Sequence, residues 1–332
     1  MGLNEGLEGP FPSALEAISA AVPSLNRYPG RGSRELVEAL STRHEVPPAS
    51  VFVAAGADAV IGYVCQAVLE TGDEVVIPWP SFPSFLRDPQ KRDAAVVTVP
   101  LADYRIDLDA MRNAITPRAR LAFLATPNNP TGLALDRDEL HAFIDDLPER
   151  VLPVIDEAYF DYLDPAARVD SIADVVRRGR DALVLRTFSK LYGLAGLRVG
   201  YGVGPEAVIG AMRKVQRGYD VGALAQVAAL ASLDDTAEAE RRRAANRDAV
   251  RLLAEALTAR GLQPVAGSVT NFVLVEVGAA VEDLVSTLLR AGVAVQSGAP
   301  FGAPSAVRIS TGSHADVARL DAALADAGFP EG

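Results

Sequence analysis

Lys190 stands in a segment, residues 187 to 201, whose residue types could carry out amine chemistry. Thr187 and Ser189 lie just before the lysine, and Arg198 follows it. Partial burial and a neighbouring positive charge both lower the pKa of an amine, so this lysine can be held neutral. Because a neutral amine forms a Schiff base with an aldehyde, we expect Lys190 to react with a carbonyl group.

The polar groups near Lys190 are those that bind a phosphate. The hydroxyls of Thr187 and Ser189 can donate hydrogen bonds, and Arg198 supplies a fixed charge that pairs well with phosphate oxygens. A ligand that offers both an aldehyde and a phosphate satisfies the whole group. The segment therefore predicts pyridoxal 5'-phosphate (PLP) as the cofactor.

Composition limits the kinds of partner that this chain can bind. The 332 residues carry a net charge of −11, and 49% of them are apolar. Such an acidic chain is not expected to bind nucleic acid or an anionic membrane, and no apolar run approaches the roughly 18 residues of a membrane span. With three histidines and no CxxC or HExxH pattern, we expect no metal site. The absence of a signal-peptide pattern predicts a cytoplasmic protein.

Short apolar segments alternate with helical patterns through the first two thirds of the chain. Helices are expected at 33–44, with Ser33 as the cap, and after residue 56 and over 137–147. Strands are expected at 51–56, 73–78, 94–100, 121–127, 151–159 and 181–190. This alternation predicts an α/β fold whose mostly parallel central sheet is covered by helices on both faces. Ligands of such sheets bind just past the carboxyl ends of the strands.

The pattern changes after about residue 222. A long charged helix over 237–261 is followed by strand candidates at 271–277 and 306–311, and the arginine triplet 241–243 is interpreted as a solvated helix face. We therefore expect a smaller α+β C-terminal domain over 226–332. A large PLP-binding domain is expected over 28–225, preceded by an N-terminal arm or small-domain segment over 1–27.

Two further motifs lie at the carboxyl ends of predicted strands. TPNNPTGL (126–133) and VIDEAYFDY (154–162) each also fit a plain reading, as a turn or as a capping aspartate beside a core tyrosine. Their order along the chain resembles fold-type I PLP enzymes of the aminotransferase class I/II superfamily. The segments at 4–18, 27–30, 54–58 and 307–313 resemble histidinol-phosphate aminotransferase and its close relatives. The succession that carries the resemblance is Asn129, Asp156, Tyr159, Thr187, Ser189, Lys190 and Arg198.

The resemblance implies a role for each residue around the cofactor ring. Lys190 is the Schiff-base lysine, which also moves the substrate proton. Asp156 is the partner of the pyridine nitrogen and keeps it protonated, so that the ring can accept electrons. Asn129 and Tyr159 hydrogen-bond the phenolic oxygen of the ring, and Phe82 stacks on the ring.

The same resemblance implies how the cofactor phosphate is held. The backbone N–H groups of Ala57 and Asp58 lie at a helix start, which is an anion-binding position. Thr187, Ser189 and Arg198 add side-chain donors. Tyr28 resembles a tyrosine that reaches the phosphate from the neighbouring subunit, which implies a homodimer with shared active sites.

The substrate end of the site departs from the family pattern. Arg308 resembles the arginine that binds the substrate α-carboxylate. Glu8 stands where these enzymes typically have a tyrosine, and Gln296 stands where an arginine tends to bind the substrate phosphate. Losing that cation and gaining a carboxylate disfavours a phosphorylated substrate. We expect a non-phosphorylated substrate, with a basic amino acid paired with Glu8 as the working hypothesis.

The resemblance implies an aminotransferase that moves an amino group between an amino acid and a 2-oxo acid by a ping-pong mechanism. A decarboxylase, an eliminase or a cyclase is the alternative, because all of these share the contacts to the cofactor. A PLP-binding regulator without turnover is a further alternative. The complete set of ring contacts favours an enzyme over that regulator.

Overall fold

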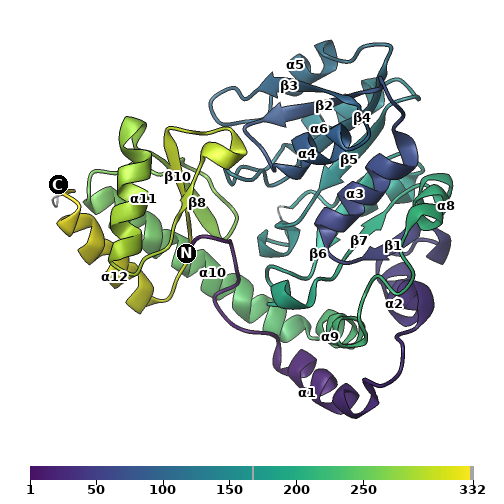
Figure 1. Cartoon of the computed structure of the whole chain (residues 1–332), viewed down its shortest axis with the longest axis horizontal. Helices are drawn as coiled ribbons and strands as arrows, with labels where there is room; N and C mark the ends of the chain where they lie inside the picture. Colours follow the sequence, from purple (N-terminus) through teal and green to yellow (C-terminus); the bar gives the residue numbers. More distant parts are fainter. Residues whose placement is uncertain (167, 330–332) are drawn as a thin grey trace.

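The computed structural model describes residues 1–166 and 168–329, and a seven-stranded sheet forms the centre of its larger body (Figure 1). The strand order is β1-β7-β6-β5-β4-β2-β3. Strands β3, β2, β4, β5 and β6 run parallel, and β7 is antiparallel to both β6 and β1. The strands are β1 (Val51–Ala54), β2 (Glu74–Trp79), β3 (Ala95–Pro100), β4 (Ala119–Ala125), β5 (Leu152–Asp156), β6 (Leu183–Thr187) and β7 (Gly200–Val203). This confirms the expected mostly parallel sheet.

Helices pack on both faces of this sheet (Figure 1). They are α1 (Pro12–Ala21), α2 (Arg34–His44), α3 (Ala57–Val68), α4 (Ser84–Gln90), α5 (Leu108–Asn113), α6 (Arg137–Asp146), α7 (Ser171–Asp174), α8 (Glu206–Val215) and α9 (Ala223–Asp234). Ser33 precedes α2 as expected, but it adopts a left-handed conformation with φ of 51° and its side chain makes no cap hydrogen bond. The expected capping role of Ser33 is therefore wrong.

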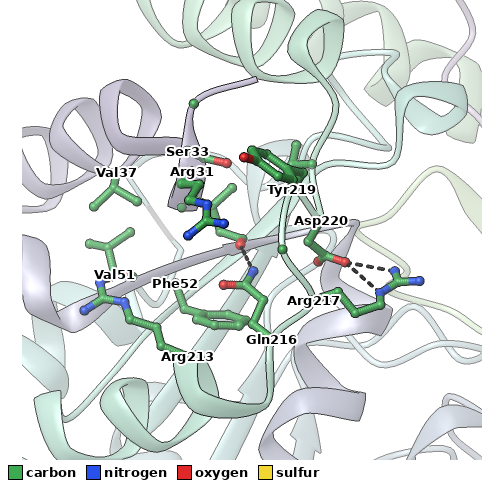
Figure 2. Close-up of a pocket in the computed structure, with 15 residues that line it drawn as sticks. Arg31, Ser33, Val37, Val51, Phe52, Arg213, Gln216, Arg217, Tyr219 and Asp220 are labelled. Atoms are coloured by element: carbon green, nitrogen blue, oxygen red, sulfur yellow. Dashed lines mark hydrogen bonds and ion pairs between the residues drawn. The ribbon is translucent and has the colours of Figure 1, made fainter. Parts of the chain in front are cut away.

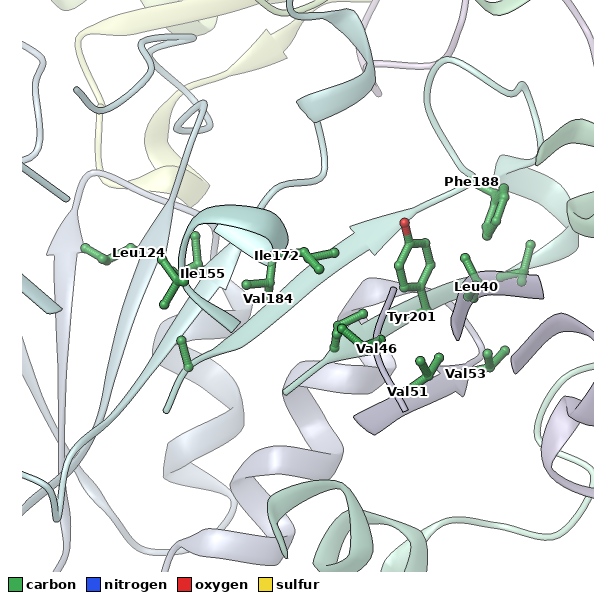
Figure 3. Packing of buried hydrophobic residues seen from close by; sticks show 14 of the residues in the cluster. Leu40, Val46, Val51, Val53, Leu124, Ile155, Ile172, Val184, Phe188 and Tyr201 are labelled. Atoms are coloured by element: carbon green, nitrogen blue, oxygen red, sulfur yellow. The ribbon is translucent and has the colours of Figure 1, made fainter. Parts of the chain in front are cut away.

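Apart from the edge strand β3, which is partly exposed, the strands bury both of their faces in two separate hydrophobic layers. Val53, Ile155 and Val184 belong to the layer beneath α1, α2, α5, α6 and α9, part of which is shown in Figure 3. Phe52 and Phe123 point the opposite way and pack with α3, α4 and α8. Because both faces are buried, the strands are continuous apolar runs rather than alternating ones. This is why they could be recognised in the sequence.

Side chains cover the outer edge of β1. Nη2 of Arg213 donates to the carbonyl of Val51 at 2.8 Å, and Nε2 of Gln216 donates to that of Val53 at 2.7 Å (Figure 2). A polar cavity of about 410 Å³ lies beside this edge. The unpaired carbonyls of an edge strand are a site for pairing with another chain, and here these two are occupied.

A smaller antiparallel sheet in the order β8-β10-β9 forms the second body of the molecule. Its strands are β8 (Phe272–Glu276), β9 (Gln296–Ser297) and β10 (Ala306–Ser310), and its helices are α10 (Thr236–Ala259), α11 (Val281–Arg290) and α12 (His314–Asp326). Leu253 and Leu257 of α10 pack in its core with Val273, Val307 and Leu320. The expected smaller α+β domain is present.

Residues 27 and 225 are the expected domain boundaries, and the contacts near them show which body each segment joins. Helix α9 continues past residue 225 and packs with the large sheet through Ala228, Ala229 and Leu233. Ser310 of the small sheet donates its backbone N–H to the carbonyl of Met1, whereas α1 packs against α9. The first residues therefore lie on the small body, and α1 lies on the large one.

Across residues 1–166 and 168–329, none of the helices is both long enough and apolar enough to cross a lipid bilayer.

A buried ion pair supports the strand that leads to Lys190. Nε and Nη2 of Arg186, in β6, donate to Oε2 of Glu157 at 2.9 and 2.7 Å. The two residues are 4% and 1% exposed. Burial raises the pKa of the Glu157 carboxyl, and the charge of Arg186 opposes that rise. The carboxylate therefore depends on Arg186 for its charge.

We predict that Arg186→Met lowers the free energy of unfolding by about 3–5 kcal/mol, because it leaves Glu157 as an uncompensated buried charge. Urea unfolding followed by circular dichroism measures this change. Arg251→Met, which removes an exposed pair with Glu255, is the control and should hardly move the unfolding midpoint. Equal effects from the two substitutions would contradict the prediction.

Candidate active site

A cavity of about 370 Å³ lies where the two bodies meet, and it brings most of the predicted site residues together. It is also lined by Leu3, Asn4, Glu5, Pro127 and Phe301. The predicted residues that line it are Ala57, Asp58, Phe82, Asn129, Asp156, Tyr159, Thr187, Ser189, Lys190, Arg198, Gln296 and Arg308. Glu8 and Tyr28 are not part of this lining.

The large sheet explains why distant residues meet in this cavity. Asp156 is the last residue of β5, and Thr187 is the last residue of β6. The two strands are parallel neighbours, so their carboxyl ends lie on the same edge. Asn129 follows β4 on that edge. Ala57 opens α3 just after β1.

The amine of Lys190 has a pKa below its ordinary value. Its Nζ donates to the carbonyl of Asn4 at 3.0 Å and to that of Leu3 at 3.4 Å. Burial lowers the pKa of Lys190 to about 8, and the charge of Arg308 adds to the effect. About a tenth of the amine is therefore unprotonated at pH 7, and this neutral form is the one that reacts with an aldehyde.

Asp156 carries a buried carboxyl group that calls for a cationic partner. Its Oδ1 accepts a hydrogen bond from the backbone N–H of Ala158 at 2.9 Å. Burial raises the pKa of Asp156 to about 7. A protonated pyridine nitrogen placed against this group would restore its charged form, because a nearby cation favours the carboxylate. Asp156 therefore fits the ring of PLP.

Arg308 is 3% exposed and belongs to the small body, yet it faces the large one. Its Nη1 donates to Oδ1 of Asn129 at 2.6 Å, and its Nη2 donates to the carbonyl of Gly2 at 2.9 Å. Its Nε is buried and has no hydrogen-bond partner among the described residues. An unsatisfied buried donor on a guanidinium is costly, and a carboxylate ligand would satisfy it.

Three elements converge to form an anion cradle. The first backbone N–H groups of α3 have no partner within the helix. Gly56, with φ of +97°, precedes them, and a methyl group there would lie 2.7 Å from Nη2 of Arg198. Oγ1 of Thr187 donates to Oγ of Ser189 at 3.0 Å on the third side. These groups fit a phosphate, and the positive φ at residue 56 favours glycine there.

Three other residues near the cavity are the two aromatic candidates for ring stacking, Phe82 and Trp79, and the polar residue Gln296. Phe82 lines the cavity, and the edge of its ring meets that of Phe85 with centroids 5.9 Å apart. Trp79, the other aromatic residue near this motif, packs against Gly302 instead. Gln296 lies beside Arg308 in the small sheet and lines the cavity.

Glu8 does not reach the cavity. Its carboxylate pairs with Arg241, and Nη2 of Arg242 lies 4.0 Å away. The expected pairing of Glu8 with a substrate is thus replaced by pairing with α10. The interpretation of the arginine triplet as solvated is wrong for Arg242 and Arg243, since both are buried and Nη1 of Arg242 donates to the carbonyl of Gly9 at 2.6 Å.

Tyr28 lies away from the cavity of its own chain. Its side chain is 82% exposed, and its ring stacks on Tyr219 with centroids 4.8 Å apart. A contact with a cofactor phosphate would therefore have to be made in a second chain.

The N-terminal segment supplies cavity residues that sequence reasoning missed. Leu3, Asn4 and Glu5 line the cavity, and Nδ2 of Asn4 donates to the hydroxyl of Tyr159 at 2.9 Å. The motif at 4–18 is the sequence signal for this segment, and Asn4 and Glu5 are its first polar residues.

An amine, a buried carboxylate and a phosphate cradle at the carboxyl edge of such a sheet define a fold-type I PLP enzyme. Residues 1–325 match the family described as Aminotransferase class I and II, and the chain belongs to this family. The protein is therefore a PLP-dependent aminotransferase.

Two curated relatives cover most of the chain. An aromatic amino acid aminotransferase of Rhodococcus opacus is 42% identical over 313 residues, which is 93% of this chain and 84% of the relative. Histidinol-phosphate aminotransferase 2 of Ralstonia nicotianae is 39% identical over 331 residues, 98% of this chain and 88% of the relative.

Solved structures share the same fold. Histidinol-phosphate aminotransferase from Sinorhizobium meliloti, in complex with PLP, superposes with a TM-score of 0.91 at 30% identity over 98% of this chain and 89% of that one. Aspartate aminotransferase from Thermus thermophilus with maleate gives 0.85 at 28% identity over 97% and 88%.

We predict that Lys190 of the cofactor-free protein reacts with formaldehyde and a borohydride reductant at a rate that rises with pH and levels off above about pH 8. Only the neutral amine reacts, and its fraction grows about tenfold per pH unit below the pKa. Peptide mass spectrometry measures the methylation of each lysine. Lys214, exposed on α8, is the reference. A plateau only near pH 10 would contradict the prediction.

Proposed function

We propose that the protein transfers the amino group of a non-phosphorylated amino acid, with an aromatic or other apolar side chain, to a 2-oxo acid by a ping-pong mechanism. The observation that carries this proposal is the set of charges around the cavity. The cations of the described lining are Lys190, Arg198 and Arg308. Each of them has a use other than binding a distal phosphate.

The positions of these cations argue against a phosphorylated substrate. Lys190 must react with the aldehyde, and Arg198 lies at the phosphate cradle of α3. Arg308 offers its buried Nε for a carboxylate. A substrate phosphate would be left without a cation, and an unpaired dianion is costly to desolvate.

Apolar groups favour an uncharged substrate side chain. Leu3, Pro127 and Phe301 line the cavity, and the guanidinium carbon of Arg308 lies 4.3 Å from the ring centroid of Phe301. Phe301 is thereby placed next to the proposed carboxylate site. The relative from Rhodococcus opacus, an aromatic amino acid aminotransferase, supports the same choice.

The protein's own residues perform the steps around the substrate. Arg308 binds the α-carboxylate and so fixes the orientation of the Cα atom. PLP, when bound, supplies the electron sink that makes the Cα–H bond acidic. Nζ of Lys190, once neutral, accepts the Cα proton as a general base. Asp156 would hold the pyridine nitrogen in its protonated form, and Asn129 and Tyr159 would hydrogen-bond the phenolic oxygen.

The size of the site supports the proposed ping-pong order. The cavity of about 370 Å³ contains one arginine, Arg308, with a buried free donor among the described residues. The amino donor and the oxo acid acceptor both carry an α-carboxylate. They must therefore use Arg308 in turn, so the first product leaves before the second substrate binds.

We predict that phenylalanine or tyrosine removes the visible absorption band of the holoenzyme at least about tenfold faster than histidinol phosphate or arginine does, a difference of about 1.4 kcal/mol. Stopped-flow absorbance measures this half-reaction. Arg308→Lys should lower the rate with every donor, because lysine lacks the bidentate geometry. Lys190→Ala should abolish the visible absorption band, because the band depends on this lysine. A preference for histidinol phosphate or for arginine would refute the proposed substrate class.

We also propose a homodimer in which Tyr28 completes the phosphate cradle of the partner. Tyr28 stacks on Tyr219, and the guanidinium of Arg31 lies 5.4 Å from the ring centroid of Tyr219, so the three side chains form an exposed cluster. Arg31 and Tyr219 also line the β1 cavity (Figure 2). Tyr28 does not line the cavity of its own chain. An exposed aromatic cluster of this kind is typical of protein interfaces.

We predict that mixing Lys190→Ala and Tyr28→Phe proteins restores PLP binding of wild-type affinity in one of the two sites of each hybrid. In that hybrid, the chain with the intact lysine receives the intact tyrosine from its partner. Fluorescence titration with PLP measures the affinities, and analytical ultracentrifugation measures the mass. A monomeric protein, or hybrids no tighter than the Tyr28→Phe parent, would contradict the shared site.

A further inference from the structure

Asn4 lies between Tyr159 of the large body and Ser310 of the small body. Its Nδ2 donates to the hydroxyl of Tyr159 at 2.9 Å. Its Oδ1 accepts from the hydroxyl of Ser310 at 2.8 Å, and its backbone N–H donates to the same hydroxyl at 2.9 Å. Asn4 is 1% exposed, and its φ of 52° is in the left-handed region. All three hydrogen bonds are thus shielded from water.

Ser310 fixes the direction of these hydrogen bonds. Its oxygen accepts from the backbone N–H of Asn4, so its single proton goes to Oδ1 of Asn4. A flipped Asn4 amide would present N–H groups to Ser310 and leave the serine proton without an acceptor. Since Ser310 is 2% exposed, that loss would cost about 1–3 kcal/mol. The amide nitrogen of Asn4 therefore points at Tyr159.

This orientation determines what Tyr159 can do. A phenol hydroxyl has one proton, and its oxygen also accepts. Because the oxygen of Tyr159 already accepts from Asn4, its proton is available to an acceptor in the cavity. In the role proposed for Tyr159, this acceptor is the phenolic oxygen of PLP.

We propose that Asn4 is a positioning residue, which makes Tyr159 a hydrogen-bond donor toward the phenolic oxygen of PLP. The proposal rests on the roles proposed for Lys190 and Tyr159. Asn4 acts through Tyr159. It also places the lysine through its own carbonyl, which accepts from Nζ of Lys190 at 3.0 Å.

The surroundings of Tyr159 keep its proton in place. Burial raises the pKa of Tyr159, and the charge of Asp156 acts in the same direction. The charge of Arg308 and the hydrogen bond from Asn4 oppose the rise. Nζ of Lys190 lies 5.6 Å from the centroid of the tyrosine ring, and Phe272 meets that ring edge-on. Tyr159 therefore stays a donor across the working pH range.

A pH titration of the visible absorption band of the holoenzyme tests the proposal. Tyr159→Phe removes the donor, which destabilises negative charge on the phenolic oxygen and raises the pH at which the band shifts. Asn4→Asp places an acceptor against Tyr159, so the tyrosine donates to residue 4 instead, and we expect a rise of about one pH unit, a tenfold change in the proton equilibrium. Asn4→Ala should give a smaller rise.

A double variant separates this role from a structural one. In the Tyr159→Phe background, Asn4→Ala should add nothing, because the two residues act through one hydrogen bond. Asn4→Asp in the same background measures the effect of its charge alone. The rise caused by Asn4→Asp in the presence of Tyr159 must exceed that value.

Asn271→Ala is the matched control. Nδ2 of Asn271 donates to the carbonyl of Glu5 at 2.9 Å, so this substitution loosens the same segment without touching Tyr159. We expect an unchanged titration. The inference is overturned if Asn271→Ala shifts the band as much as Asn4→Ala does, or if the effect of Asn4→Ala persists without Tyr159. A wild-type protein without a Lys190-dependent band would instead refute the proposed function.

Discussion

A buried carboxyl group that forms no ion pair with any described residue is the constraint around which this site is arranged. None of the ion pairs within residues 1–166 and 168–329 includes Asp156, whose pKa burial raises to about 7. The neighbouring Glu157 is equally buried, but Arg186 neutralises it. Two consecutive buried carboxyl groups at the end of β5 thus differ in whether an arginine pairs with them. The pair at Glu157 stabilises the chain, and the group at Asp156 is left for a ligand.

The site also depends on contacts between parts of the chain that fold as separate layers. Arg308 comes from the small sheet and donates to Asn129 of the large body. Asn4 hydrogen-bonds both Tyr159 and Ser310. The proposed substrate site is therefore built from both bodies. In this proposal, the large body would contact the cofactor ring and phosphate, and Arg308 of the small body would bind the substrate carboxylate.

The sequence was sufficient for residues whose position follows from a strand end. Asp156 and Lys190 could be placed because both follow continuous apolar runs of a doubly covered sheet. Glu8 could not be placed, since its partner Arg241 lies on a helix far along the chain and no local pattern encodes that contact. Asn4 was missed for the same reason.

Strand β7 was also absent from the predicted strands, and packing explains the omission. Gly200 and Gly202 weaken the strand signal, yet a methyl group at Gly200 would lie 2.5 Å from the backbone nitrogen of Ala57. The close approach of β7 to the start of α3 excludes a larger side chain. Close packing here outweighs strand propensity.

The antiparallel pairing of β1 with β7 has a consequence for synthesis of the chain. β1 has β7 as its partner in the sheet, and the two are paired from Val51↔Val203 to Ala54↔Gly200. At about 5–20 residues per second, a ribosome needs roughly 7 to 30 s to make the roughly 150 residues between them. The apolar strand β1 emerges early and must wait for its neighbour. Arg213 and Gln216, which cover its other edge, arrive later still.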